Sequence, residues 1–336
     1  MTAAAVEVEG LVKIYRGGVG AVDAVTFSVR EREVFGFLGP NGAGKSTTIR
    51  CVIGLLRATD GRARVRGVDV CQHPGVLKRT VGYAAQETGV DDRLTGWENL
   101  YLQGRFYHLS RSEIRRRGEE VLRLLGLWER RRQLAETYSG GMLKRLDIAC
   151  ALVHRPNILF LDEPTLGLDV QTRKAIWEYI RRLRAQHGMT IFLTTHSMEN
   201  ADLLADRVAI IDRGRTVALD RPGALKAGIG GDLITVRFAA ADGGVADVLA
   251  AIAAFPEVRE AQGGIHRIVV GQGGDRLVPA IVQLADSHGL SVHSIRLKRP
   301  TLDDVYLHYT GRQIRDAEGS QEETFRTRLL RRWIRR

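Results

Sequence analysis

The glycine-rich segment GPNGAGKST, residues 39–47, constrains this chain more than any other stretch of its sequence. It follows an apolar, strand-like run (EVFGFL) and precedes a helix-like run (TTIRCVIGLL). The pattern G-x-x-x-x-G-K-[ST] in this setting wraps backbone N–H groups around phosphates. The segment therefore predicts an α/β domain whose phosphate-binding loop holds a nucleotide.

The positions of this loop have separate expected roles. Lys45 is expected to reach the β- and γ-phosphate oxygens, and the Ser46 hydroxyl to ligate Mg²⁺. The cofactors that we expect are therefore ATP and Mg²⁺. The expected nucleotide contacts in the loop are Gly39, Asn41, Gly42, Gly44, Lys45, Ser46 and Thr47.

A second segment, ILFLDE at residues 158–163, reads as a buried strand that ends in two carboxylates. Folds with a phosphate-binding loop deliver their second metal contact from such a strand end, which assigns Asp162 to Mg²⁺. Glu163 would then project beside the γ-phosphate, where a general base polarises water. The two segments together predict a site that hydrolyses a nucleoside triphosphate.

A third segment, YSGGMLKRLDIAC at residues 138–150, raises a question. A serine and two glycines at the start of a helix form an anion receiver, because free N–H groups and the helix dipole favour phosphate there. The chain nevertheless has a single nucleotide motif. This second phosphate receiver needs a nucleotide from elsewhere.

The bulk properties fit a cytosolic protein of roughly two domains. The 336 residues are 44% hydrophobic and 26% charged, and no apolar run approaches the ~20 residues of a membrane span. We expect no signal peptide, and we interpret Cys51, Cys71 and Cys150 as reduced thiols. The net charge of +11 fits either a nucleic-acid binder or a protein on an anionic membrane, and it does not choose between them.

The chain predicts a main domain over residues 1–222, with a helical subdomain at about 90–150. A linker at 221–232 leads to a second domain at 232–312. Its strands and helices follow a βαββαβ order, typical of a ferredoxin-like α+β fold. In its last helix Leu302, Val305, Tyr306 and Tyr309 share one face, which favours core packing.

Residues 313–336 form a basic tail that is either an amphipathic helix on an anionic membrane surface or an unstructured tail.

Four motifs in this order resemble the ATP-binding subunit of an ABC transporter, over residues 5–220. They are the phosphate-binding loop, the S-G-G segment, D-E-P-T-x-G-L-D directly after the second strand, and T-T-H some thirty residues on. YSGGM is the usual signature form in the drug-exporter branch. The segment PTLDDVYLHYTGR, residues 300–312, resembles the closing motif of daunorubicin-resistance-type ATPases.

The resemblance implies further site residues. Tyr15 would stack on adenine, and Gln86 would touch Mg²⁺ and link to a membrane partner. His196 would hold the γ-phosphate, so that Glu163, His196 and Gln86 are the expected catalytic residues. The remaining contacts would come from the signature and the following loop, namely Ser139, Gly140, Gly141 and Asp169. Leu143 departs from the family, and we interpret it as an exposed leucine that packs on a partner.

The resemblance implies an ATP-hydrolysing subunit of an exporter on the cytoplasmic face of the membrane. Two copies would form a homodimer around two ATP molecules and drive a separate integral membrane permease. That permease would dock into a groove formed by residues 97–135 and the Gln86 loop. The cargo implied is a lipophilic drug-like or lipid substrate.

Two other hypotheses are weaker. Soluble ABC ATPases that act on nucleic acid or ribosomes typically carry two ATPase domains, coiled-coil insertions or zinc modules. This chain has one phosphate-binding loop, no heptads and no CxxC, so we expect no nucleic-acid partner. A carbohydrate- or lipid-binding role for residues 232–311 would predict a β-sandwich, which the βαββαβ order contradicts.

Overall fold

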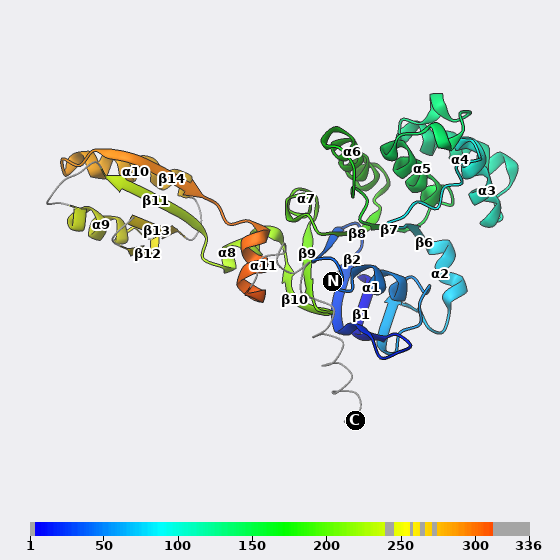
Figure 1. Ribbon diagram of the computed structural model, residues 1–336, viewed down its shortest axis with the longest axis horizontal. Helices are drawn as coiled ribbons and strands as arrows, with labels where there is room; N and C mark the ends of the chain where they lie inside the picture. The colour runs from blue at the N-terminus through cyan, green and yellow to red at the C-terminus, as the bar shows by residue number, and fades with distance from the viewer. Residues whose placement is uncertain (1–3, 239–244, 256–257, 263–265, 271–273, 312–336) are drawn as a thin grey trace. The chain divides into compact units, whose positions relative to one another are not determined.

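A central six-stranded sheet carries the candidate site along one edge (Figure 1). The computed structural model describes residues 4–238, 245–255, 258–262, 266–270 and 274–311. These residues form two compact units that divide between Leu219 and Asp220. The sheet belongs to the first unit.

The order of the sheet is β10-β9-β3-β8-β7-β6. Pairs β6–β7, β7–β8, β8–β3 and β3–β9 are parallel, so their carboxyl ends share one edge. Every residue of β3, β7 and β8 is buried, as their apolar sequences predict. The strands are β3 Val34–Leu38, β6 Val81–Ala84, β7 Ile158–Asp162, β8 Thr190–Thr195, β9 Arg207–Asp212 and β10 Arg215–Asp220.

A four-stranded antiparallel sheet covers the loop helix α1 (Lys45–Val52) and shares its core. Its order is β2-β1-β4-β5, with β1 Ala4–Ile14, β2 Gly20–Arg30, β4 Asp60–Val65 and β5 Val68–Asp69. Phe27, Phe35, Phe37 and Phe192 pack with ring centroids 5.3–5.7 Å apart between the two sheets. The short helix α2 (Pro74–Thr80) leads into β6.

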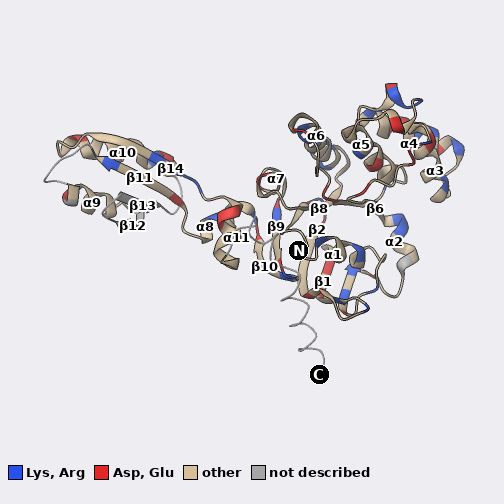
Figure 2. Cartoon of the chain, viewed as in Figure 1, with Lys and Arg blue, Asp and Glu red and all other residues tan. Residues whose placement is uncertain are grey.

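Three helices form the helical part that residues 97–135 and the signature segment predict. They are α3 Gly96–Phe106, α4 Arg111–Leu124 and α5 Gly140–Leu152. Capping boxes at Thr95/Glu98 and Ser110/Glu113 start the first two helices. Charges of both signs lie along α4, and Arg117 pairs with Glu113 at 2.7 Å, so part of the arginine-rich run is a paired helix face (Figure 2).

Helix α6 (Val170–His187) is capped by Asp169, whose carboxylate accepts the Thr172 N–H. It packs against α5, and α7 (Met198–Leu204) follows β8. Among the described residues, no helix has both the length and the apolar character that a bilayer span requires.

The second unit has a four-stranded antiparallel sheet in the order β12-β13-β11-β14. Its elements follow the predicted βαββαβ order. They are β11 Asp232–Phe238, α9 Val245–Ala253, β12 Val258–Gln262, β13 His266–Val270, α10 Gly274–Ser287 and β14 Val292–Lys298.

Two expectations about this unit need correction. The predicted linker 221–232 contains a helix, α8 (Pro222–Gly228), which begins with proline at its first position. In α11 (Leu302–Thr310), Leu302, Val305 and Tyr306 are buried as predicted, but Tyr309 is 49% exposed. The basic tail 313–336 lies outside the described residues.

Candidate active site

A cavity of about 400 Å³ opens at the shared carboxyl edge of the strands. Strands β3, β6 and β7 lead directly into the segments that line it, which explains why residues far apart in sequence meet there. The residues around it are Ala21, Asn41, Gly42, Gly44, Lys45, Ser46, Thr47, Gln86 and Glu163. All the predicted loop residues except Gly39, and two of the predicted catalytic residues, therefore share one cavity.

Two glycines of the loop have no room for a side chain. A Cβ atom at Gly39 would overlap the Ile211 carbonyl oxygen, and one at Gly44 would overlap the Ala21 carbonyl oxygen. Gly44 also has φ +100°, which a residue with a side chain adopts only with strain. The loop is thus held in its curled form by close backbone packing.

Lys45 is buried and folds back over the loop. Its Nζ donates hydrogen bonds to the carbonyl oxygens of Gly39 (2.7 Å) and Pro40 (3.0 Å), and it lies 3.2 Å from Glu163 Oε1. The ammonium group is therefore held inside the cavity by one carboxylate and two carbonyls.

Strand pairing brings the two predicted carboxylates together through a third residue, Thr194. Asp162 and Thr194 are register partners in β7 and β8. Thr194 Oγ1 donates to Asp162 Oδ1 at 2.6 Å and accepts from the Glu163 N–H at 2.9 Å. Sequence reasoning missed Thr194, although its place in the T-T-H motif after an apolar strand is a signal.

Glu163 lies between two predicted partners. Its Oε2 is 3.0 Å from His196 Nδ1, while Oε1 faces Lys45. Burial would raise the pKa of Glu163, but the His196 hydrogen bond and the Lys45 charge outweigh burial and lower that pKa. Glu163 is therefore held as a carboxylate, the form that a general base needs.

The residues at this edge fit a magnesium ion. Asp162 is fully buried, and its Oδ2 has no hydrogen-bond partner among the described residues, which a cation ligated there would satisfy. Ser46 and Gln86 line the cavity beside Lys45. Carboxylate, hydroxyl and amide oxygens are hard ligands of the kind that Mg²⁺ prefers.

Tyr15 lies at the phosphate-binding loop. Its hydroxyl is 3.2 Å from Thr47 Oγ1, its side chain is 37% exposed, and Lys13 Nζ lies 5.5 Å from its ring centroid. The ring is thus accessible beside the loop, as a base-stacking residue must be.

The remaining predicted residues form a second group, which does not line the cavity. Ser139 caps α5 and accepts the Met142 N–H at 3.3 Å. Asp169 caps α6 through Thr172, whose N–H and hydroxyl it accepts at 2.9 and 2.6 Å. A Cβ atom at Gly141 would overlap Thr172 Cγ2, whereas Gly140 is exposed. The two predicted phosphate receivers are therefore separate within one chain.

The expected exposure of Leu143 is wrong, whereas its contact with a partner stays a prediction. Leu143 is half-buried and packs against the hydrophobic core of the helical part, together with Met142. Its position on the first turn of α5 turns the side chain toward that core, so its departure from the family pattern has an intramolecular explanation.

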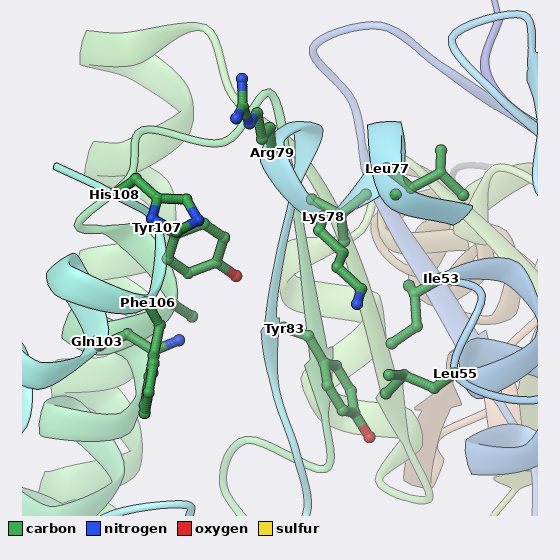
Figure 3. A pocket seen from close by; sticks show the side chains of 13 residues that line it. Ile53, Leu55, Leu77, Lys78, Arg79, Tyr83, Gln103, Phe106, Tyr107 and His108 are labelled. Atoms are coloured by element: carbon green, nitrogen blue, oxygen red, sulfur yellow. The ribbon is translucent and has the colours of Figure 1, made fainter. Parts of the chain in front are cut away.

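A larger cavity of about 590 Å³ lies between α3 and the segments around α2 and β6. In Figure 3, Gln103, Phe106 and Tyr107 face Tyr83, Ile53 and Leu55 across it. Leu55 and Phe106 are 62% and 67% exposed, and Lys78 and Arg79 add positive charge. The groove is thus formed by residues 53–55, 75–83 and the end of α3, and the predicted Gln86 loop does not line it.

Comparison with known proteins decides the family. The ABC transporter family model matches residues 22–166. The daunorubicin/doxorubicin resistance ATP-binding protein DrrA of Streptomyces peucetius is 40% identical over 326 residues, 95% of this chain and 97% of that protein. This chain belongs to the ABC transporter ATP-binding proteins of the daunorubicin/doxorubicin-resistance type. It is an ABC transporter ATPase that binds and hydrolyses ATP.

Two further relatives of this ABC ATPase bear on its function. The linearmycin resistance ATP-binding protein LnrL of Bacillus subtilis (strain 168) is 35% identical over 315 residues, 92% of this chain and 99% of that protein. A dimeric, post-hydrolysis ATP-binding cassette bound to ADP and phosphate is 26% identical with a TM-score of 0.59. That match covers 64% of this chain and 98% of the cassette.

Proposed function

We propose that this ABC ATPase powers the efflux of a lipophilic, drug-like or lipid substrate through a separate membrane permease. The observation that carries the proposal is that Lys45 and Glu163 meet at one cavity, with His196 hydrogen-bonded to Glu163, in a chain of this family. Two full-length relatives are named for resistance to daunorubicin or doxorubicin and to linearmycin, which supports a drug-like cargo.

In the proposed mechanism, ATP draws Lys45 away from the carbonyl oxygens of the loop. The ammonium group then contacts phosphate oxygens instead of Glu163. Glu163 is left with His196 as its hydrogen-bond partner and can accept a proton from the attacking water. His196 also donates toward the γ-phosphate.

Ser46, Asp162 and Gln86 would hold Mg²⁺, which offsets the negative charge of the phosphates when it is bound. Thr194 fixes the Asp162 carboxylate through a 2.6 Å hydrogen bond, so the metal contact is oriented before nucleotide binds. Tyr15 would stack on the adenine ring.

The second group of residues supports a homodimer. Ser139, Gly140 and Gly141 form a helix N-terminus suited to phosphate, yet they do not line this chain's own cavity. We propose that they contact ATP held by a second copy, with Asp169 at the same interface. The dimeric form of the related cassette supports this arrangement.

The groove between α3 and β6 suits a cytoplasmic segment of the permease. Exposed Leu55 and Phe106 offer apolar contacts, and Lys78 and Arg79 favour an acidic or carboxyl-rich neighbour. We also propose that the ATPase lies on the cytoplasmic face of the membrane, where this groove would meet the cytoplasmic segment of the permease. The tail at 313–336 remains a candidate for contact with anionic lipid on sequence grounds alone.

The second unit is proposed to be a ferredoxin-like regulatory or dimerisation domain. Its antiparallel sheet order β12-β13-β11-β14 and its βαββαβ element order support the fold. We infer its role from the family extension.

Purification with the permease tests the proposed function. The wild-type complex should show ATPase activity that rises when daunorubicin is added. Glu163→Gln should retain ATP binding and abolish both the basal and the drug-stimulated rate. If lipophilic drugs did not change the ATPase rate of the complex, the proposed cargo class would be contradicted. Normal ATP turnover in Glu163→Gln would reject Glu163 as the general base.

A further inference from the structure

Two buried charged side chains of α5 have no role in the site so far. Lys144 and Asp147 are 5% and 8% exposed, and Lys144 Nζ lies 3.7 Å from Asp147 Oδ2. Both follow Ser139 on the same helix. A buried ion pair is expensive to desolvate and is weak evidence for stability by itself, so its contacts need an explanation.

Both side chains reach the segment that carries Gln86. Lys144 Nζ donates to the Ala85 carbonyl oxygen and lies 3.5 Å from the Gln86 carbonyl oxygen. Asp147 Oδ1 accepts the Gly89 N–H at 3.3 Å. The pair therefore holds the backbone on both sides of Gln86 to α5.

Asn99 of α3 forms hydrogen bonds with the same segment. Asn99 Oδ1 accepts the Asp91 N–H at 2.8 Å, and its amide donates to the Asp91 carbonyl oxygen at 2.9 Å. The stretch from Ala85 to Asp91 is thus attached to two helices of the helical part, although it leaves from the central sheet at β6.

Burial and nearby charge act in opposite directions on the pKa of Lys144. Burial lowers the pKa of Lys144, while the charges of Asp147, Asp162 and Glu163 oppose that change.

We propose that Lys144 and Asp147 are positioning residues that fix Gln86 relative to the signature helix. The inference rests on the proposed role of Gln86 at the metal. When α5 approaches ATP on the second copy, Gln86 moves with it. The contact of Ser139 with the partner's nucleotide and the contact of Gln86 with the chain's own metal then form together.

A mutant cycle on the full-length ATPase tests this proposal. Lys144→Met should lower kcat by about tenfold and leave the Kd for ATP within about twofold, because the nucleotide contacts are untouched. Lys144→Arg should restore most of kcat, since a guanidinium group can still donate to the loop carbonyls. The double variant Lys144→Met/Gln86→Ala should be no slower than Gln86→Ala alone.

The controls separate the possible failures. Lys174→Met, on the exposed side of α6, should match the wild type. If Lys144→Met does not fold, the double variant Lys144→Met/Asp147→Asn replaces it in the mutant cycle. This double variant removes both charges of the pair, so neither is left buried without a partner. Losses that multiply in the combined variant, or a wild-type kcat in Lys144→Met, would overturn the proposal. A normal kcat in Gln86→Ala would instead reject the assigned role of Gln86.

Discussion

Glu163 shows how backbone and side-chain contacts orient a single residue of the candidate site. Its backbone has φ +48°, a left-handed conformation that costs a residue with a side chain about 1 kcal/mol. The hydrogen bond from its N–H to Thr194 holds this conformation and aims the carboxylate between Lys45 and His196. Such strain at a proposed catalytic position indicates a side chain oriented in advance of substrate binding.

Lys45→Ala should weaken ATP binding by about 10- to 100-fold, because a buried charge-assisted contact to phosphate is lost. The measurement is the Kd for ATP by calorimetry in the presence of Mg²⁺. Lys78→Ala, in the groove between α3 and β6, is the matched control and should bind ATP normally. A Kd within twofold of the wild type in Lys45→Ala would remove Lys45 from the nucleotide site.

His154 predicts a pH effect on stability. It is buried, its Nε2 lies 3.0 Å from the Val81 carbonyl oxygen, and its ring stacks on Tyr107 at 3.7 Å. Burial lowers the pKa of His154 from 6.5 to about 4. The unfolded state therefore binds more protons between these values, and His154's contribution to the free energy of unfolding falls by about 3 kcal/mol as pH drops through them.

The pH dependence of wild-type stability alone does not isolate His154, because Asp147 changes the free energy of unfolding in the opposite direction. A variant is therefore needed for comparison. Burial raises the pKa of Asp147 from 3.8 to about 6, so its contribution falls as pH rises. Urea unfolding of the wild type and of His154→Phe, at pH 7 and pH 4, isolates the histidine. Their stability difference should shift against the wild type at pH 4, and a difference independent of pH would show that His154 does not titrate as described.

The sequence predicted some of these residues and not others for a physical reason. Asp162 and Glu163 lie at the end of an apolar strand, which is a local signal. Thr194 reaches Asp162, 32 residues away in the sequence, through strand pairing, and Lys144 donates to Ala85, which is 59 residues away. No local sequence pattern contains either contact.

At the scale of elements, α5 and α6 approach each other closely at Gly141. A methyl group at Gly141 would overlap Thr172 Cγ2, so Gly141→Ala should lower the free energy of unfolding by about 1–3 kcal/mol. Thr172→Ser removes that methyl group and keeps the hydroxyl for Asp169, so it should restore much of the loss. Denaturant unfolding measures both effects.

Gly140→Ala is the matched control, because the nearest atom to its Cβ would be Leu168 Cδ2 at 3.8 Å. This substitution should be neutral, or stabilising by up to ~1 kcal/mol through helix propensity. Equal losses in Gly140→Ala and Gly141→Ala would mean that the α5–α6 contact is not the cause.

Element types were easier to predict than element ends. The buried strands were evident from apolar runs, but the start of α6 is set by Asp169, a polar cap that an apolar pattern does not mark. The helix α8 was hidden by the proline and glycines of 221–232, which read as a linker. Leu143 was misjudged because its exposure depends on where the helical core lies.

At the scale of the whole molecule, the separation of the two phosphate receivers predicts association on ATP. Glu163→Gln with ATP and Mg²⁺ should sediment as a dimer, since binding persists without turnover. Adding Ser139→Arg should return it to the monomer while each chain still binds ATP, because the bulky cation blocks the helix N-terminus. A dimer that survives Ser139→Arg, or a persistent monomer in Glu163→Gln, would contradict the proposed interface.

The contact between Gly141 and Thr172 also bears on how this family can diverge. Thr172 touches the signature glycine with its methyl group and serves Asp169 with its hydroxyl. Two motifs that are thirty residues apart thus share one side chain. In a lineage that acquires a larger residue at 141, position 172 must first become smaller without losing its hydroxyl. These two sites should accordingly evolve as a pair, with serine at 172 as the permissive intermediate.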